Sequence, residues 1–373
     1  MYYNTAYVGM DVHKGSFTLR YFTVEMDAPS APVRIPANYK LVLKYLDSIR
    51  NHLSDDIRII CGYEAGCLGY TLYRQLVSHN QECVILAPST MPEPKGKKKI
   101  KTDNRDAGDI ATCLAYRTYK SVHVPTEQDE QVKEFLRMRD DHKQALKKIK
   151  QQILAFCLRH GLQYEGTKNH WTATHLQWLH SLALEAVYQE SLEEYLLTYR
   201  QLADKLERLD RRIEEIATGE TYRDNVKKLS CFLGVKTYTA LSVLTEVGDF
   251  NRFPTANQFA SYLGLVPGEH SSSDDRNRLG ITKAGNRHVR MLLIEAAQRY
   301  GRGKAGYKSN ALKVRQAGNT PAVIAYADRA NERLRRRYYH MVLGNNKKSN
   351  VAKAAIAREL ACFIWGMMTE RIA

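Results

Sequence analysis

Four acidic residues in the N-terminal third of the chain lie in or beside expected strands and helices of one region. Asp11 lies in an apolar strand candidate, residues 5–12, and Glu64 follows a second apolar run. Asp103 and Asp106 are three residues apart at an expected helix start, so they share one helix face. A charge beside a buried strand needs a partner or a metal. Carboxylate oxygens suit Mg²⁺, and two such ions can stabilise both oxygens of a phosphodiester displacement. The sequence therefore predicts a magnesium site in an α/β domain.

Each acidic residue also has a structural explanation. Asp11 fits a turn residue or a buried partner of an arginine, and Glu64 fits a solvated loop carboxylate. Asp103 and Asp106 fit a helix cap and a favourable charge on the helix dipole. Asp109, a further three residues on, is expected to be a surface helix residue. The order of the first four within one α/β region favours the metal site.

Residues 1–125 alternate short apolar runs with helical patterns. This alternation, with short connections, predicts a mainly parallel central sheet flanked by helices. The expected strands are residues 5–12, 17–24, 57–62 and 83–86, and the expected helices are residues 40–53, 70–78 and 106–119.

Residues 126–224 are expected to form a helical arm. Residues 127–160 are glycine-free and helical in period, and a second segment carries apolar residues at alternating spacings of three and four. This spacing is typical of a coiled-coil seam, for which self-association is the preferred use. The alternative is a helix packed against the chain's own core. The seam residues are Leu192, Tyr195, Tyr199, Leu202, Leu206, Leu209, Ile213 and Ile216.

Residues 225–373 are expected to form a compact, mostly helical unit. It opens with two apolar helices joined by a Gly-Val-Lys turn, which fits either a phosphate-gripping helix-hairpin-helix or an ordinary αα-hairpin. A long polar loop follows, and then a helix from Arg287. The loop holds serines 271–273, which alone suggest a flexible linker. A serine attacks phosphate only with a base or a metal to activate it, and His270 is a candidate proton carrier.

The charge balance favours a phosphate-rich partner. Lys and Arg number 56 against 40 Asp and Glu, for a net charge of +16. Residues 95–101 hold five lysines, residues 276–315 hold eleven cations and one acid, and four arginines follow within residues 333–337. Such a partner is nucleic acid or an anionic membrane surface, and clusters of one sign favour nucleic-acid contact over a merely solvated surface, which usually mixes signs. No apolar run of eighteen residues and no cleavable signal is present, so membrane insertion and export are not expected. The expected nucleic-acid contacts are Lys97, Lys98, Lys99, Lys283, Arg287 and Arg290.

The seven cysteines form no CxxC pair and mostly have apolar neighbours, which predicts reduced core thiols in a cytoplasmic protein. With nucleic acid as its expected partner, the protein is expected to be nucleoid-associated.

Six motifs occur together in a characteristic order: VGMDVHK, GYEAG, KTDxxDA, SYLGLVP, HSSS and GITKAGN. In this order they resemble the DEDD transposases of bacterial insertion sequences, a family that includes the pilin-gene inverters. The resemblance covers nearly the whole chain. It implies a RuvC-like, ribonuclease-H-like domain in residues 1–125, a coiled-coil arm in residues 126–224, and a C-terminal transposase domain in residues 225–373.

The resemblance also implies a mechanism. Asp11, Glu64, Asp103 and Asp106 would bind Mg²⁺, and a serine of the C-terminal domain would attack DNA. Members work with a structured bridge RNA that pairs with donor and target DNA. The expected function is RNA-guided DNA recombination through a phosphoserine intermediate, by a homodimer or tetramer. A RuvC-type nuclease that uses water is the alternative, and a non-enzymatic nucleic-acid scaffold is a third possibility.

The serine motif departs from the family's usual pattern. Counted from Pro267, Ser272 best matches the nucleophile and Ser271 is next. Relatives usually place a glycine directly after the reactive serine, whereas here Asp274 follows the serines and the next glycine is Gly280. The loop therefore lacks the backbone freedom that a glycine would give it at this point.

Overall fold

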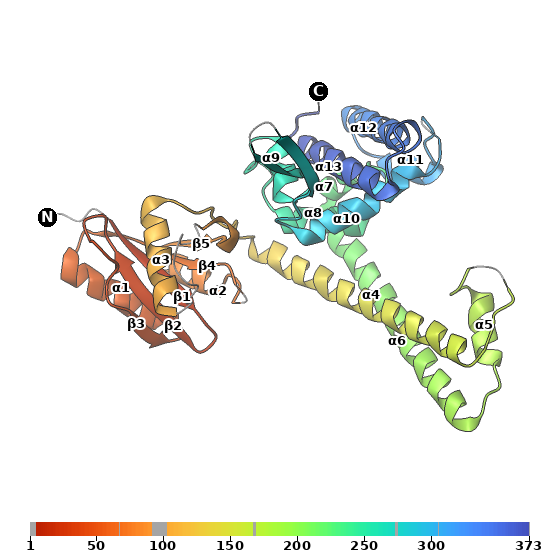
Figure 1. The fold of residues 1–373 in the computed structure, drawn as a ribbon, viewed down its shortest axis with the longest axis horizontal. Coiled ribbons are helices and arrows are strands. Elements are labelled where there is room, and N and C mark those ends of the chain that lie inside the picture. Colours follow the sequence, from red (N-terminus) through yellow and green to blue (C-terminus); the bar gives the residue numbers. More distant parts are fainter. Residues whose placement is uncertain are drawn as a thin grey trace. The chain divides into compact units, whose positions relative to one another are not determined.

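The computed structural model describes residues 5–66, 68–91, 103–166, 169–272, 275–304 and 306–372, with the side chains of 89, 103–105 and 269–279 outside the description (Figure 1). The chain divides into two compact units, Met1–Val124 and Pro125–Ala373. Lys97, Lys98 and Lys99 lie outside the described residues.

The N-terminal unit is built on a mixed sheet of five strands in the order β3-β2-β1-β4-β5. Strands β1, β2 and β3 pair antiparallel, whereas β1, β4 and β5 pair parallel. The sheet is therefore mixed and not mainly parallel as predicted, because β2 returns antiparallel beside β1 and β3 returns antiparallel beside β2. The strands are β1 (Thr5–Val12), β2 (Ser16–Phe22), β3 (Val33–Pro36), β4 (Arg58–Glu64) and β5 (Glu82–Leu86).

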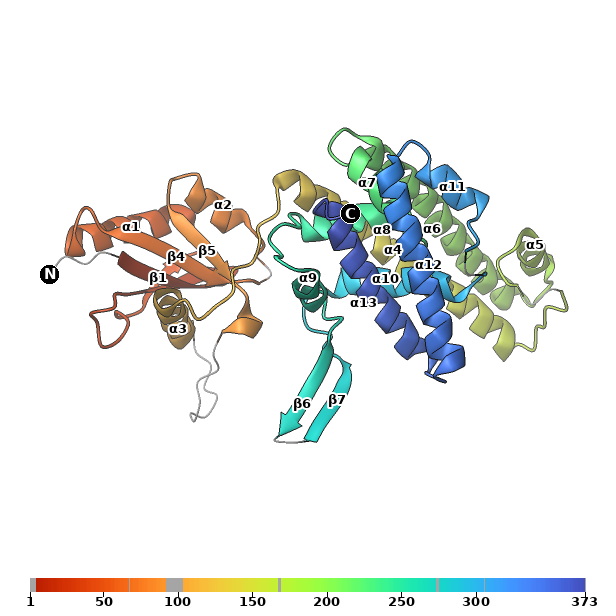
Figure 2. The ribbon, with the colours of Figure 1, turned by 90° about the horizontal axis from the view of Figure 1, so that it is seen from above.

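Helices cover both faces of this sheet. Helices α1 (Tyr39–Leu53) and α2 (Thr71–Val77) lie on one face, and α3 (Asp103–Tyr116) lies on the other (Figure 2). The first face buries Val8 and Met10 of β1 with Leu46 of α1, and the second buries Leu114 of α3 against Leu86. Alternate residues of β1 thus serve two cores, as the two-residue period of a strand requires. A short 3₁₀ turn, η1 (Pro88–Thr90), follows β5.

The C-terminal unit begins with two long helices that pack along each other. Helix α4 (Glu127–Arg159) extends away from the other helices of this unit, and α5 (Ala173–Ser181) lies at its far end. Helix α6 (Ala186–Thr218) then runs back along α4 (Figure 1). Leu192 of α6 packs with Ile153 of α4 near α5, and Ile213 packs with Leu136 nearer the helical body. The predicted seam therefore has its partner within the chain, which corrects the expectation that it pairs with a second copy.

The remaining helices form one body around a shared apolar core. Its most buried residues include Phe232, Phe259, Leu293, Tyr300 and Ile356. The helices are α7 (Arg223–Leu229), α8 (Thr237–Val247), α9 (Ala256–Tyr262), α10 (Arg287–Ala297), α11 (Asn310–Gln316), α12 (Pro321–Tyr339) and α13 (Ser349–Met368), with short turns η2 (Gln298–Gly301) and η3 (His340–Gly344). Among the described residues, no helix has the length and hydropathy needed to cross a bilayer.

A two-stranded hairpin replaces the polar loop expected before Arg287. Strands β6 (Pro267–Ser272) and β7 (Asp275–Ile281) pair antiparallel and project from the helical body (Figure 2). Residues 267–281 are mostly polar or glycine, so the sequence carries no alternating hydrophobic signal of a strand there. Elsewhere, the six described cysteines are free and five of them are buried, which agrees with the predicted core thiols.

Candidate functional site

Two of the four candidate carboxylates follow paired positions on neighbouring parallel strands. Gly9 of β1 pairs with Gly62 of β4, and the next residues along the two strands also pair. Asp11 and Glu64 come two residues after these glycines, so they lie on the same face of the sheet as Gly9 and Gly62. Helix α3 covers that face, since a Cβ on Gly9 would lie 2.0 Å from the Ala107 carbonyl oxygen.

The direction of α3 brings the other two acidic positions to the same end of the sheet. Tyr116, the last residue of α3, lies 6.0 Å from Phe22 between ring centroids, and Phe22 pairs with the beginning of β1. Helix α3 therefore runs antiparallel to β1, and its first turn lies toward the end of the strand that carries Asp11. The backbone thus gathers Asp103 and Asp106 at the end where the two strand carboxylates lie.

The side chains at this end have specific surroundings. Asp11 Oδ2 lies 3.1 Å from His13 Nε2, and the Asp11 side chain is half-buried. Toward the other end of α3, the pKa of the Cys113 thiol is raised, mainly by burial and further by the charges of Asp109 and Glu64, although a hydrogen bond with Thr118 opposes the shift. Asp109 itself is exposed, as predicted. Among described side chains, no group of three or more His, Cys, Asp or Glu could hold a metal ion, and the Asp103 side chain lies outside that set.

The candidate serines lie at the tip of the β6–β7 hairpin. Ser272 pairs with Asp275 and Ser271 pairs with Arg276, the last pairs before the turn. Ser273 lies outside the described residues. The backbone therefore presents Ser271 and Ser272 at the end of a projecting ribbon.

The base of this hairpin is held by close backbone contacts. Gly264 and Gly285 have φ values of +64° and +97°, which favour glycine. A Cβ on Gly264 would lie 2.2 Å from the Ala284 oxygen, and one on Gly285 would lie 2.0 Å from the Tyr262 oxygen. The SYLGLVP and GITKAGN motifs thus form the two sides of one junction, where the strands enter and leave the helical body.

Arg290 strengthens this junction, which corrects its assignment as a nucleic-acid contact. Its side chain is 8% exposed, and Nη1 donates to the Leu263 carbonyl oxygen at 2.7 Å. Burial lowers the pKa of Arg290, and the nearby Arg287 charge lowers it further. Arg287 and Lys283 are exposed, as a phosphate contact requires.

The arginines of residues 333–337 are also engaged within the protein. Arg333 and Arg337 bind the two oxygens of Glu359 at 2.5 and 2.7 Å, and Arg336 pairs with Glu332. Arg335 is buried and donates to the Lys304 carbonyl oxygen at 2.6 Å. This run is therefore a weaker basic surface than its sequence suggests.

The Gly-Val-Lys turn between α7 and α8 packs inward. The Leu233 amide donates to Asn331 Oδ1 at 2.8 Å, and the Val235 amide donates to the Phe232 oxygen at 3.2 Å. A Cβ on Gly234 would lie 2.4 Å from the Ala296 oxygen. Because the Val235 amide already has a partner and Gly234 packs against the Ala296 oxygen, the geometry favours the ordinary αα-hairpin over a phosphate-binding turn.

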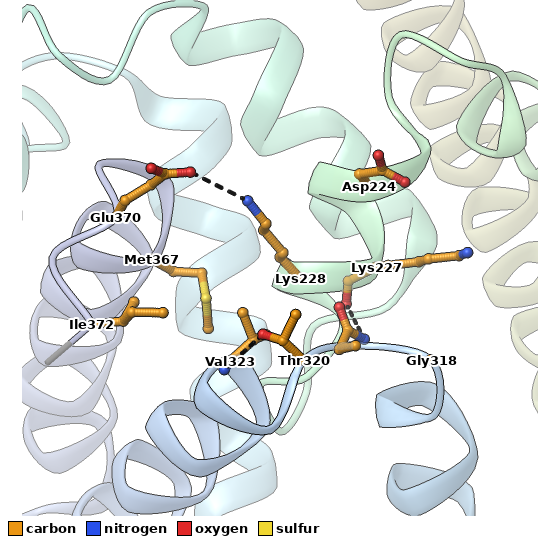
Figure 3. A pocket seen from close by; sticks show the side chains of 10 residues that line it. Asp224, Lys227, Lys228, Gly318, Thr320, Val323, Met367, Glu370 and Ile372 are labelled. Atoms are coloured by element: carbon orange, nitrogen blue, oxygen red, sulfur yellow. Dashed lines mark hydrogen bonds and ion pairs between the residues drawn. The ribbon is translucent and has the colours of Figure 1, made fainter.

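A surface pocket of about 580 Å³ lies between α7, α12 and α13 (Figure 3). Lys228 Nζ lies 3.8 Å from a Glu370 carboxylate oxygen, and Lys227 and Asp224 also line the pocket. Two cations and two acids balance there, so the charge of the lining does not select an anion. The lining includes no residue of the hairpin or of the acidic end of the sheet.

One buried carboxylate at the hairpin base was not singled out from the sequence. The Glu246 side chain is 5% exposed and binds Arg137 at 2.8 Å. Its second oxygen accepts from Asn286 Nδ2 at 3.0 Å. The signal for it is an acid near the end of the apolar helix α8, the same kind of signal that identified Asp11.

Both ends of the chain match known transposase families. Residues 226–309 match the transposase family IS116/IS110/IS902, and residues 8–160 match the DEDD transposase model for IS110. A putative transposase, y4qE, of Sinorhizobium fredii is 36% identical over 83% of this chain and 75% of its own length. The transposase for insertion sequence element IS1533 of Leptospira borgpetersenii is 31% identical over 90% of this chain and 96% of its own length.

Proposed function

This chain belongs to the IS116/IS110/IS902 family of transposases, and from that premise we propose a bridge-RNA-guided DNA recombinase that works through a phosphoserine intermediate. Membership of this family shows that the protein is an enzyme that acts on DNA in transposition. The observation that supports the chemistry is the gathering of four acidic positions at one end of the sheet. Asp11 and Glu64 reach it from β1 and β4, and α3 brings Asp103 and Asp106.

The mixed sheet supports a RuvC-like assignment for the N-terminal domain, residues 1–125. Its order, β3-β2-β1-β4-β5, combines an antiparallel run with parallel strands and places acids on a central strand, its parallel neighbour and a covering helix. A helical arm in residues 126–224 and a transposase domain in residues 225–373 complete the proposed organisation. Within it, a homodimer or tetramer would hold two duplexes through surfaces other than the buried seam.

The acidic positions fit Mg²⁺ by the chemistry of their donors, because carboxylate oxygens are ligands that this ion prefers. Asp11, Glu64, Asp103 and Asp106 would hold it. When bound, Mg²⁺ would supply electrostatic stabilisation of phosphoryl oxygens. The chain's own part is to keep Asp11 half-buried beside His13, on a strand fixed by α3.

The hairpin would supply the nucleophile. The hydroxyl oxygen of Ser272, or of Ser271, forms a bond to phosphorus while the bond from phosphorus to a DNA oxygen breaks. The serine proton ends on the departing oxygen, so one phosphodiester replaces another and no ATP is needed. Attack by a DNA hydroxyl on the phosphoserine reverses these changes and rejoins the strand. Exposed Lys283 and Arg287, with Lys97, Lys98 and Lys99, would contact nucleic-acid phosphates.

A covalent adduct is the direct test. End-labelled donor DNA is incubated with the protein, Mg²⁺ and RNA transcribed from the element's non-coding end, and is then run on denaturing gels. We expect a labelled species that survives heat and detergent, with the adduct mapped to Ser272 or Ser271. Ser272→Ala should remove both the adduct and rejoining, while Ser261→Ala, on α9, should retain both.

A water-using nuclease of the RuvC type is the second candidate, because no glycine directly follows the candidate serines. It would give free 5′-phosphate ends without an adduct, and every serine variant in residues 271–273 would keep full activity. That combination would contradict the phosphoserine mechanism. Omitting the RNA tests guidance separately, since a guided enzyme should then lose selection of its target.

A further inference from the structure

We infer that Glu246 is a positioning residue that fixes the serine hairpin to the arm helix α4. The inference rests on the proposed function, since it takes the hairpin to carry the nucleophile. The Glu246 side chain is 5% exposed and lies at the end of α8, between α4 and the hairpin base. A carboxylate buried to this degree is stable only when its oxygens have strong partners.

The two oxygens of Glu246 serve different elements. Oε1 accepts from Arg137 of α4, at 2.9 Å from Nε and 2.8 Å from Nη2. Oε2 accepts from Asn286 Nδ2 at 3.0 Å. The oxygen of the Asn286 side chain fixes the orientation of that side chain. This Oδ1 caps α10 by accepting from the Val289 backbone amide at 3.0 Å. The carboxylate thus connects the arm helix to the residue that begins α10.

Asn286 also ties this connection to the hairpin. Its backbone amide donates to the Tyr262 oxygen at 3.0 Å, beside the close contact between Gly285 and the same oxygen. The Tyr262 hydroxyl donates to the Glu246 backbone oxygen at 3.4 Å. Both sides of the hairpin base therefore contact Glu246 or its immediate partner.

A second contact links α4 to the first turn of α10. His288 Nδ1 lies 3.8 Å from Asp140 Oδ2, and Asp140 is 9% exposed. Arg137 and Asp140 are three residues apart, so they share one face of α4. This face of α4 therefore reaches the start of α10 at two points, through Glu246 and Asn286 from Arg137, and directly at His288 from Asp140.

This arrangement matters because the hairpin has little stability of its own. A two-stranded ribbon is marginal in water, so its base determines where the tip points. Reaction requires atoms placed to within about 1 Å, and a misplacement of that size costs roughly a hundredfold in rate. Ser272 lies at the tip, five residues beyond Pro267, so a small rotation at the base becomes a larger displacement of the serine.

Glu246→Gln tests the contacts of Glu246 with Arg137 and Asn286, because glutamine has nearly the same shape as glutamate. In glutamine an NH₂ group replaces one of the two carboxylate oxygens. This group is a donor, and it would face another donor, either Asn286 Nδ2 or the Arg137 guanidinium. Asn286 cannot rotate to compensate without losing its cap on Val289. In the full-length protein, we expect amide hydrogen exchange in residues 264–287 to accelerate by about tenfold. We expect the rate of adduct formation to fall by about ten- to a hundredfold.

Matched variants separate positioning from general destabilisation. Arg137→Met should reproduce the effect, whereas Arg212→Met should not, although it removes an exposed arm arginine that pairs with Glu215 at 2.6 Å. Combining Arg137→Met with Glu246→Gln should cost less than the sum of the single changes. If Glu246→Gln fails to fold, Asn286→Ser replaces it, because serine keeps a helix cap but is too short to reach Glu246.

Each result bears on the inference. Unchanged exchange in residues 264–287 would overturn it, as would faster exchange with an unchanged rate of adduct formation. An equal effect of Arg212→Met would also overturn it. If the wild-type protein forms no adduct, the proposed function fails, while the exchange measurement still decides whether Glu246 holds the hairpin.

Discussion

The α-carbon of Gly285 lies against the carbonyl oxygen of Tyr262, so closely that a Cβ on Gly285 would be 2.0 Å from that oxygen. Gly264 makes the reciprocal contact with Ala284 from the other side of the hairpin base. The glycines of the two C-terminal motifs are thus required by packing, whatever the chemistry at the tip. A family signature can therefore lie at some distance from the reacting atoms.

Gly285→Ala should destabilise the C-terminal unit. Alanine at a φ of +97° is strained, and its Cβ would overlap the Tyr262 oxygen. We expect the free energy of unfolding to fall by about 2–4 kcal/mol in urea titrations. Gly280→Ala is the matched control, because a Cβ there meets no atom within 4 Å. Equal stability of the two variants would show that the hairpin base tolerates rearrangement.

The elements of the N-terminal unit were largely predictable because their side chains carry a regular apolar pattern. The expected strand at residues 5–12 is β1, and the expected helix at residues 40–53 differs from α1 by one residue. Strand β3 was missed, since it has four residues and is mostly exposed. The positions of Asp11 and Glu64 at strand ends followed from the same pattern.

The sequence could not show which residues distant in the chain contact one another. The heptad spacing in α6 indicated a buried stripe but not that α4 buries it. The count of cations did not distinguish Arg290, which binds a carbonyl oxygen, from the exposed Arg287. Glu246 gains its importance from Arg137 and Asn286, which are distant in the chain. Such pairings arise from tertiary structure, which local periodicity does not encode.

The arm seam gives a prediction about stability. Leu192 is fully buried between α6 and α4, so Leu192→Lys places a charge in an apolar cluster. We expect the free energy of unfolding to fall by about 3 kcal/mol or more. Leu197 on the same helix is 46% exposed, and Leu197→Lys should change stability by only about 0.5 kcal/mol. A Leu192→Lys variant that keeps its stability but has a lower oligomeric mass in light scattering would contradict this prediction. It would mean that a second copy of the chain packs on the seam.

The acidic end of the sheet gives a prediction about metal dependence. Asp11→Asn removes a charge but keeps the side-chain shape, so strand cleavage should fall by at least about a hundredfold while nucleic-acid binding is retained. Mg²⁺ titration calorimetry should show weaker binding to the same variant. Asp56→Asn, at an exposed position, is the control and should leave both measurements unchanged. Normal cleavage by Asp11→Asn would leave that residue a structural role beside His13.

Arg287 and Arg290 lie three residues apart on α10 but should respond oppositely to neutralisation. Arg287 is exposed, so Arg287→Gln should remove one phosphate contact and flatten the log–log dependence of affinity on salt by about 0.9 for duplex DNA. The free energy of unfolding of the Arg287→Gln variant should stay the same.

Arg290→Gln should leave the slope of affinity against salt unchanged, because the buried guanidinium donates to the Leu263 oxygen. The loss of this charged hydrogen bond should lower the free energy of unfolding by about 1.5–3 kcal/mol. Filter binding across a salt series, with urea unfolding of the same samples, checks both. A flatter slope for Arg290→Gln at unchanged stability would mean that this arginine turns outward to bind nucleic acid.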